Sequence, residues 1–254
     1  MKVQKEAGVL RLTFDRPERL NAVTDVILDE LAEAVEQAPS DPDVRVVVLA
    51  GEGRAFCSGA DISDDRPADR ASTSTIDAGE RLVRAITTSP LPVVALARGV
   101  VAGIGVPIAL AADLTLSDED SYFLLAFTRI GLMPDGGASA LVAASVGRAR
   151  ALRLALLAEK LPAREAAAAG LIGGVHPVAD YEAEVQKVLD QLTNGPAVAY
   201  ARTKASINEA TLGPLNQTFR TELAGQIGLL EAADFAEGQR AFAEKRKPRF
   251  SDRP

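Results

Sequence analysis

Two glycine-bearing turns are the first places in this sequence where chemistry could occur. One spans residues 54–61 and the other spans residues 99–105, and each follows an apolar run that is typical of a buried strand. Small residues let a ligand approach the backbone, and N–H groups at the start of a helix favour negative charge. Two such N–H groups that converge on one point would stabilise an oxyanion. The alternative is that the glycines only serve tight turns.

Other residue types that often do chemistry form weaker patterns. The one histidine, His176, lies in a Gly-Gly-Val-His-Pro segment that we expect to be a loop, and no serine or cysteine motif lies beside it. A catalytic triad is therefore not indicated. The one cysteine, Cys57, is expected to pack beside the first turn. No spaced His, Cys and carboxylate cluster indicates a metal, and Gly103-x-Gly105 lacks the third glycine of a dinucleotide-binding fingerprint.

The elements that position these turns alternate along the chain. Thr24 is the expected N-cap of a helix that continues to Val35. Hydrophobic patterns predict strands at 10–14, 44–49, 93–96 and 114–116, and further helices at 81–87, 106–112, 148–158 and 163–169. This alternation favours right-handed βαβ crossovers and an α/β core. From Tyr181 to about Arg246 we expect only helices, and we expect Ser63 to Asp77 to form a mobile loop or a frayed helix.

Composition limits the classes of protein that are possible. The chain has 254 residues, of which 47% are hydrophobic and 25% charged, and this suits one large domain with a sizeable core. The formal net charge of −7 argues against nucleic acid as a main partner. A single cysteine excludes an internal disulfide. Neither a signal peptide nor an apolar run of the ~18 residues that a membrane span needs is recognisable, so we expect a cytoplasmic protein without a membrane segment.

Six segments resemble, in chain order, the signature segments of the enoyl-CoA hydratase/isomerase (crotonase) family. They cover residues 16–22, 53–62, 103–113, 130–137, 168–172 and 242–248. Any one segment is weak evidence, but six in order make the resemblance specific. It implies an α/β fold, a crotonase-like spiral of ββα and βαβ units over residues 1–190 that carries an acyl-CoA site. It also implies a C-terminal helical layer over residues 191–254 that assembles a homotrimer or a dimer of trimers.

The resemblance also implies how an acyl-CoA thioester would be held. The backbone N–H groups of Ala60 and Ile104 would donate to the thioester carbonyl and stabilise an enolate, and one such donor is commonly worth ~10²–10³ in rate. The residues with implied contacts to the coenzyme A moiety are Arg19, Ala22, Ser58, Ala60, Asp61, Ile62, Phe242 and Lys245. Arg246, Lys247 and Arg249 form a basic patch suited to the 3′-phosphate. No metal and no cofactor beyond this coenzyme moiety is expected.

Two positions depart from the family pattern. A typical hydratase of the family activates water with two glutamates, and this sequence has Pro107 and Phe127 at the matching positions. Asp135, in a Pro-Asp-Gly-Gly segment, matches an acidic residue that carries the chemistry in isomerases resembling the phenylacetate-pathway enzyme. We therefore expect an isomerase that converts 3-enoyl-CoA to 2-enoyl-CoA with Asp135 as proton shuttle. The alternatives are a hydratase, a non-catalytic acyl-CoA-binding protein, or a structural oligomer without ligand. Asp135 itself could instead only cap a helix.

Overall fold

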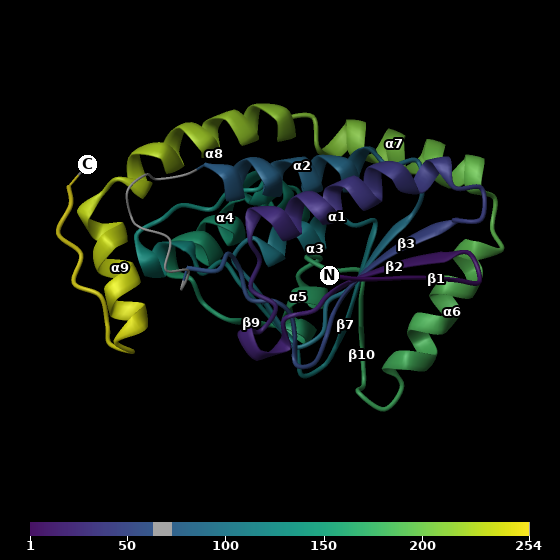
Figure 1. Ribbon diagram of the computed structural model, residues 1–254, viewed down its shortest axis with the longest axis horizontal. Helices are drawn as coiled ribbons and strands as arrows, with labels where there is room; N and C mark the ends of the chain where they lie inside the picture. Colours follow the sequence, from purple (N-terminus) through teal and green to yellow (C-terminus); the bar gives the residue numbers. More distant parts are fainter. Residues whose placement is uncertain (63–72, 254) are drawn as a thin grey trace.

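The strands form two sheets in the computed structural model, which describes residues 1–62 and 73–253 and is shown as a ribbon in Figure 1. The six-stranded sheet has the order β1 (Lys2–Glu6), β2 (Val9–Phe14), β3 (Val46–Gly51), β5 (Val93–Leu96), β7 (Leu114–Asp118) and β10 (Gly174–His176). The four-stranded sheet has the order β4 (Ala55–Cys57), β6 (Val100–Ala102), β8 (Tyr122–Leu124) and β9 (Leu161–Pro162). Strand pairing is antiparallel only at β1–β2 and β8–β9 among these strands.

Strand β3 explains why the larger sheet is covered on both faces. Val47 and Leu49 point into the main core, which includes α1 (Asp25–Gln37) and α2 (Ser74–Thr88). Val46 and Val48, on the opposite face, pack with Tyr181 of helix α6 (Tyr181–Thr193). Successive side chains of a strand alternate between faces, so an unbroken apolar run fits a strand buried on both sides.

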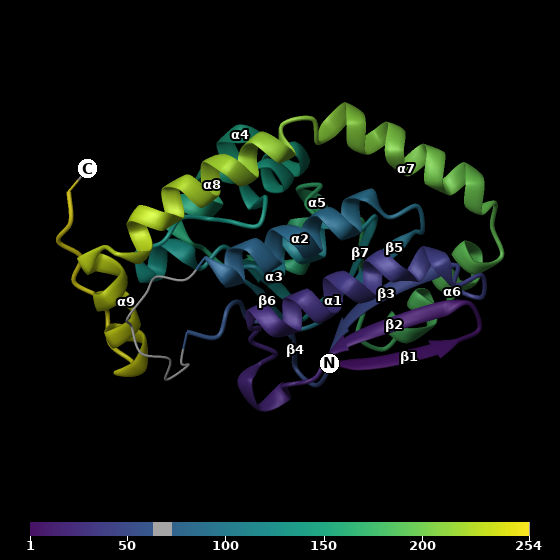
Figure 2. The same ribbon diagram turned by 45° about the horizontal axis from the view of Figure 1, so that its top comes forward.

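The remaining helices cover the core and the smaller sheet. Helix α1 begins after Thr24, whose Oγ1 accepts a hydrogen bond from the Ile27 N–H at 3.4 Å, so the predicted N-cap is confirmed. Helices α1 and α2 lie side by side (Figure 2). Helix α4 (Ala138–Leu157) begins ten residues before the predicted position and bends at Gly147, which has φ 75° and ψ 160°. The other short helices are η1 (Pro17–Arg19), η2 (Ala38–Ser40), α3 (Gly105–Ala111), η3 (Phe127–Ile130) and α5 (Ala163–Ala168).

The C-terminal part of the chain is helical, as predicted. After α6 come α7 (Ala197–Thr211), α8 (Leu215–Leu230) and α9 (Ala233–Ala243). Helices α7 and α8 extend over α2 and α4, and α9 lies at one end of the molecule (Figures 1 and 2). The predicted boundary after residue 190 falls inside α6, which packs on the larger sheet. The predicted class, an α/β core with a C-terminal helical layer, is confirmed. None of the described helices is long and apolar enough to cross a membrane.

Short elements are where the sequence-based expectation was incomplete. Strands β4 and β6 lie within the two segments expected to be turns, β8 was not predicted, and these three-residue strands form most of the second sheet. His176 was expected in a loop, but it ends β10, which pairs with β7. Strands of three residues are too short to show a period of two, so pattern alone does not predict them. Of the segment predicted as a loop or frayed helix, 63–72 lies outside the described residues and 74–77 belongs to α2.

Candidate active site

The two predicted turns meet at one edge of the smaller sheet. Strands β4 and β6 run parallel, so their carboxyl ends lie at the same edge, where ligands bind in many α/β proteins. Gly59 follows β4 with φ 114°, and Gly103 follows β6 with φ 54°, conformations that side chains rarely adopt. A Cβ atom added at Gly103 would lie 3.1 Å from the Cα of Gly59. The two backbone turns are therefore in contact.

Each glycine is followed by one of the predicted oxyanion donors. Ala60 forms a parallel bridge with Val23, in which the Val23 N–H donates to Gly59 O and the Asp61 N–H donates to Val23 O, both at 2.9 Å. The Ala60 N–H therefore points away from this bridge. Ile104 precedes the first residue of α3, where backbone N–H groups have no acceptor within the helix. Within the described ranges neither the Ala60 N–H nor the Ile104 N–H donates a hydrogen bond, which leaves both available to a ligand.

Asp135 lies next to the second turn. A Cβ atom added at Gly136 would overlap Cδ1 of Ile104, so the loop that carries Asp135 packs directly on the Ile104 side chain. The Asp135 side chain is buried, and its Oδ2 accepts a hydrogen bond from Nε2 of Gln226 at 2.8 Å. Burial, opposed by the hydrogen bond from Gln226 and reinforced by the charges of Glu222 and Glu80, raises the pKa of Asp135 to about 7. Such a carboxyl can accept and return a proton near neutral pH.

The N-terminus of α4 is capped by another residue. Glu222 of α8 accepts the Gly137 N–H at 2.7 Å and the Ser139 N–H at 2.8 Å with its two carboxylate oxygens. The Asp135 side chain is bound to Gln226 instead. The alternative in which Asp135 only caps the helix is therefore wrong. Sequence analysis did not identify Glu222 or Gln226.

The two departures from the hydratase pattern leave apolar groups in the site. Pro107 is the third residue of α3, where a helix tolerates a missing N–H, and its Cγ would lie 3.4 Å from a Cβ atom at Gly136. Phe127 is buried at the start of η3. Neither can accept a proton, although both adjoin the segments that carry Ile104 and Asp135.

Glu80 of α2 is a second carboxyl residue of this site that the sequence analysis missed. A Cβ atom at the preceding residue, Gly79, would lie 3.1 Å from Cδ1 of Ile104. Burial raises the pKa of Glu80, and Asp77 and Glu222 add to the rise. Oε1 of Glu80 is buried and has no hydrogen-bond partner in the described structure. Asp135 and Glu80 thus stand beside the two glycines that contact the Ile104 side chain.

The predicted coenzyme contacts of the N-terminal half are brought together by the η1 loop. Asn21 is almost completely buried, and its Nδ2 donates to Glu52 O at 2.9 Å and Ala55 O at 2.6 Å, which ties this loop to β4. Ser58 donates from its N–H to Leu20 O at 3.1 Å and from Oγ to Arg19 O at 3.4 Å.

Arg16 links the other predicted contacts of this region. Its guanidinium donates to Ala22 O and pairs with the carboxylate of Asp61, both at 2.9 Å. The carboxylate of Asp61 therefore already has a cationic partner within the protein. Ile62 is the last described residue before 63–72. The structure places Arg19, Ala22, Ser58, Ala60 and Asp61 in one region, and their contact with coenzyme A remains a prediction.

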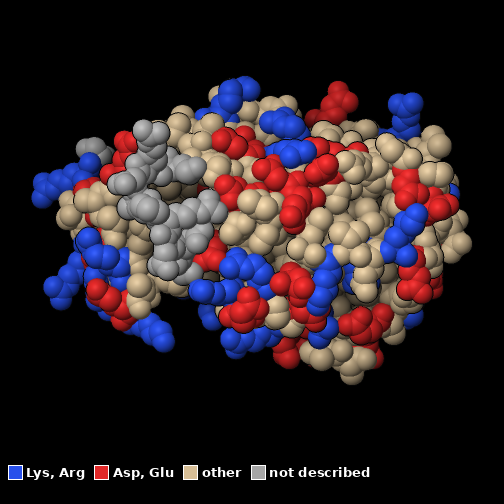
Figure 3. Space-filling view, viewed as in Figure 1, with Lys and Arg blue, Asp and Glu red and all other residues tan. Residues whose placement is uncertain are grey.

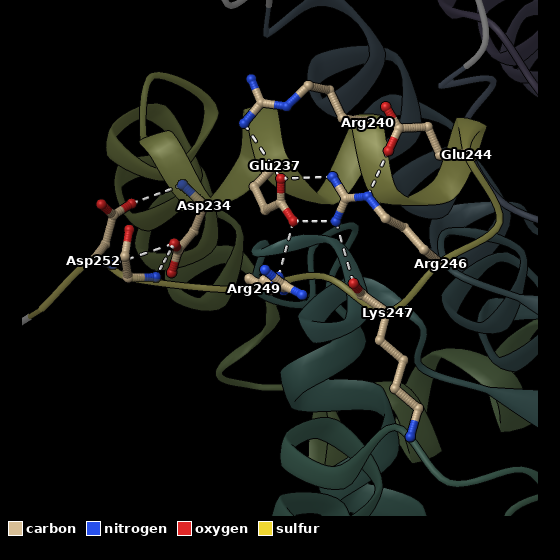
Figure 4. Close-up of polar contacts among 9 residues, drawn as sticks. Asp234, Glu237, Arg240, Glu244, Arg246, Lys247, Arg249 and Asp252 are labelled. Atoms are coloured by element: carbon tan, nitrogen blue, oxygen red, sulfur yellow. Dashed lines mark hydrogen bonds and ion pairs between the residues drawn. The ribbon is translucent and has the colours of Figure 1, made fainter.

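The C-terminal contacts lie at the α9 end of the molecule, where Figure 3 shows several Lys and Arg side chains. Phe242 and Lys245 are exposed there. The guanidinium of Arg246 is bound by Glu237 and by Glu244 (Figure 4). Because two carboxylates occupy Arg246, the charge of the predicted basic patch comes from its other members. Binding of this patch to a phosphate remains a prediction.

Comparisons with known proteins agree over the whole chain. A family model described as enoyl-CoA hydratase/isomerase matches residues 4–253. The sequence is 41% identical to a probable enoyl-CoA hydratase of Rhodobacter capsulatus, covering 97% of this chain and 95% of that protein. It is 35% identical to 1,2-epoxyphenylacetyl-CoA isomerase of Escherichia coli, covering 97% of this chain and 96% of that protein. The crystal structure of an enoyl-CoA hydratase from Mycobacterium avium subsp. paratuberculosis has a TM-score of 0.93 and 50% identity, covering 99% of this chain and 98% of that one.

Proposed function

Because this chain belongs to the enoyl-CoA hydratase/isomerase family of acyl-CoA enzymes, we propose that it converts 3-enoyl-CoA thioesters to their 2-enoyl isomers. The observation that carries the proposal is Asp135. It is a buried carboxyl with a pKa of about 7, and its loop packs on the residue that supplies one predicted oxyanion donor. Pro107 and Phe127 support the proposal, because they leave both usual hydratase positions without a proton acceptor.

The proposed reaction uses one carboxyl group twice. The thioester oxygen accepts hydrogen bonds from the N–H groups of Ala60 and Ile104. Ionised Asp135 removes a proton from carbon 2, and the electrons of that C–H bond form a conjugated dienolate whose charge rests on the thioester oxygen. The protonated Asp135 then returns the proton to carbon 4, where the former C3–C4 double bond supplies the electron pair. The double bond now lies between carbons 2 and 3, and the carboxylate is restored. A pKa near the working pH suits both steps.

Glu80 favours hydration as the second candidate. Its buried Oε1 lacks a partner among the described residues, and its helix packs on the same Ile104 side chain as the Asp135 loop does. A water molecule held between Glu80 and Asp135 would be placed to add to carbon 3 of a 2-enoyl-CoA. In that case the two carboxyls would replace the glutamates missing at positions 107 and 127.

The test is a direct assay of isomerisation. Purified protein is mixed with a 3-enoyl-CoA, and the absorbance of the conjugated 2-enoyl thioester is followed. We expect turnover that Asp135→Asn lowers about 10²–10⁴-fold while thioester binding is retained. Hydration of crotonyl-CoA without isomerisation would instead support the second candidate. Binding without either reaction would mean a non-catalytic acyl-CoA-binding protein.

We also propose a homotrimer or a dimer of trimers as the working assembly. Several large apolar side chains are exposed on the C-terminal helices, namely Val198, Ile207, Ile227 and Phe242. Burial of such side chains between subunits would be favourable. Light scattering coupled to gel filtration tests this, with an expected mass of three or six times the 26.6 kDa of one chain.

A further inference from the structure

Gln226 makes an unusual set of contacts in the core. Its side chain is 1% exposed, and Nε2 donates to both Met133 O and Oδ2 of Asp135 at 2.8 Å. Its Oε1 is buried and has no hydrogen-bond partner in the part of the chain that the structure describes. An unpaired buried amide oxygen costs stability, and an apolar side chain of similar size would avoid that cost. Packing alone therefore does not account for an amide here.

The orientation of this amide is determined by its neighbours. Nitrogen and oxygen of an amide are assigned from the hydrogen bonds that they make. The Met133 carbonyl can only accept, so the nitrogen of Gln226 must face it; the reverse orientation would bring two oxygens together. Because the same nitrogen also reaches Asp135, Oδ2 of that carboxyl faces an N–H donor. A proton on Oδ2 would point at this N–H, so Oδ1 is the oxygen that can be protonated.

We propose that Gln226 is a positioning residue that keeps Oδ2 of Asp135 as a permanent acceptor and leaves Oδ1 to exchange protons with the substrate. This inference rests on the proposed role of Asp135 as proton shuttle. Helix α8 supports the arrangement with a second contact, because Glu222, one turn before Gln226, binds the N–H groups of Gly137 and Ser139. The loop that carries Asp135 is thus held by α8 on both sides of the carboxyl.

The inference predicts a change in acidity as well as in rate. The hydrogen bond from Gln226 stabilises the ionised form of Asp135 and lowers its pKa, while burial and the neighbouring carboxylates act in the opposite direction. Without the amide donor the proton is held more tightly. We therefore expect Gln226→Met to move the acid limb of kcat/KM upward by about one pH unit, which corresponds to a roughly tenfold loss of activity at pH values below that limb.

The experiment compares Gln226→Met with Gln217→Met, which makes the same change on the exposed face of the same helix. Two readouts are used, namely the pH dependence of isomerisation and the infrared titration of the Asp135 carboxyl, identified by subtraction of the Asp135→Asn spectrum. We expect both to shift upward in Gln226→Met and neither to shift in the control. If Gln226→Met does not fold, Gln226→Glu, which keeps the shape of the side chain, should give an upward shift.

The infrared titration requires no turnover, so it separates this inference from the proposed function. The titration of Asp135 could shift upward in Gln226→Met although the protein does not isomerise 3-enoyl-CoA. That result would refute the proposed function but support the inference that Gln226 positions Asp135. A band that titrates at the wild-type pH would overturn the inference, whichever reaction the enzyme catalyses. A loss of activity that is equal at every pH would also overturn it, because that result indicates only a structural role.

Discussion

Two aspartates in this protein each accept a hydrogen bond from a side chain of a C-terminal helix. The donor is a charged lysine in one contact and a neutral glutamine in the other. Lys204 of α7 donates from Nζ to Oδ2 of Asp113 at 2.9 Å, whereas Gln226 of α8 donates from Nε2 to Oδ2 of Asp135 at 2.8 Å. Burial raises the pKa of both carboxyls. Among the described residues, a cation opposes this rise by charge at Asp113 but not at Asp135, which has a neutral amide and two carboxylates nearby.

The difference separates a structural contact from a chemical one. Lys204 is buried, and its three donors reach Ile86 O at 2.8 Å, Leu91 O at 3.3 Å and Asp113, so the group is fully satisfied. Asp113 also accepts the Val93 N–H at 2.7 Å. This arrangement fastens α7 to the core. At Asp135 no described residue supplies a cation, which costs stability but keeps the carboxyl able to change its protonation state near neutral pH.

The largest effect is expected when the structural contact between Lys204 and Asp113 is removed. Lys204→Met leaves Asp113 without its cation and two carbonyls without a donor, so we expect the free energy of unfolding to fall by about 3–5 kcal/mol. Urea unfolding at a fixed protein concentration measures this. The double variant Lys204→Met/Asp113→Asn removes the unpaired charge and should recover part of the loss. A single-variant loss below about 1 kcal/mol would show that water solvates Asp113 well enough to replace the lysine.

The opposite result is expected at the chemical contact, where Asp135→Asn should stabilise the protein. Below about pH 4 the carboxyl is neutral in the folded and the unfolded chain, so the two proteins should be equally stable. As pH rises from there to about 7, the unfolded chain releases the proton and the folded wild type retains it, so wild-type stability falls. Above pH 7 the variant should be more stable by up to about 4 kcal/mol.

Urea unfolding of the wild type and of Asp135→Asn at several pH values tests whether the variant becomes the more stable protein as pH rises. Asparagine keeps an oxygen that can accept the Gln226 N–H, so the variant changes the charge while preserving the contact. A stability difference that does not change with pH would mean that the Asp135 carboxyl is not held neutral by its surroundings.

The pH dependence of activity gives a smaller effect at the same residue. Removal of a proton from carbon 2 requires ionised Asp135, so kcat/KM should fall about tenfold per pH unit below about pH 7. Lys204→Met should leave the position of this limb unchanged, because its carboxyl partner takes no part in the proposed reaction. If the acid limb moves in Lys204→Met, the Lys204–Asp113 contact influences the acidity of Asp135, and the two contacts are not independent.

The parts of the fold and of the candidate site that could be predicted are those specified by residues close together in the sequence. The glycine turns, Asp135 and the substitutions at Pro107 and Phe127 are contiguous in sequence with recognisable segments, and the α/β core follows from its apolar runs. The contact between Asp135 and Gln226 joins residues 91 positions apart, so no local pattern specifies it.

Helix α8 nevertheless carried a usable signal. Leu215, Phe219, Glu222 and Gln226 recur at helical spacing and share its buried stripe. Two polar residues on an apolar stripe require buried partners, since buried polar groups are nearly always hydrogen-bonded. The sequence therefore indicated that α8 reaches a polar site in the core, but the identity of that site required the structure.

The smallest effect concerns Glu80, whose charge raises the pKa of Asp135. Glu80→Gln removes a like charge, so the acid limb of isomerisation should move down by roughly half a pH unit, the direction opposite to that expected for Gln226→Met. Asp77→Asn, an equal charge change on the exposed side of α2, serves as the matched control and should move the limb less. If Glu80→Gln instead abolishes hydration of crotonyl-CoA, Glu80 acts on water. The raised pKa of Asp135 would then serve a two-carboxyl hydratase rather than a single proton shuttle.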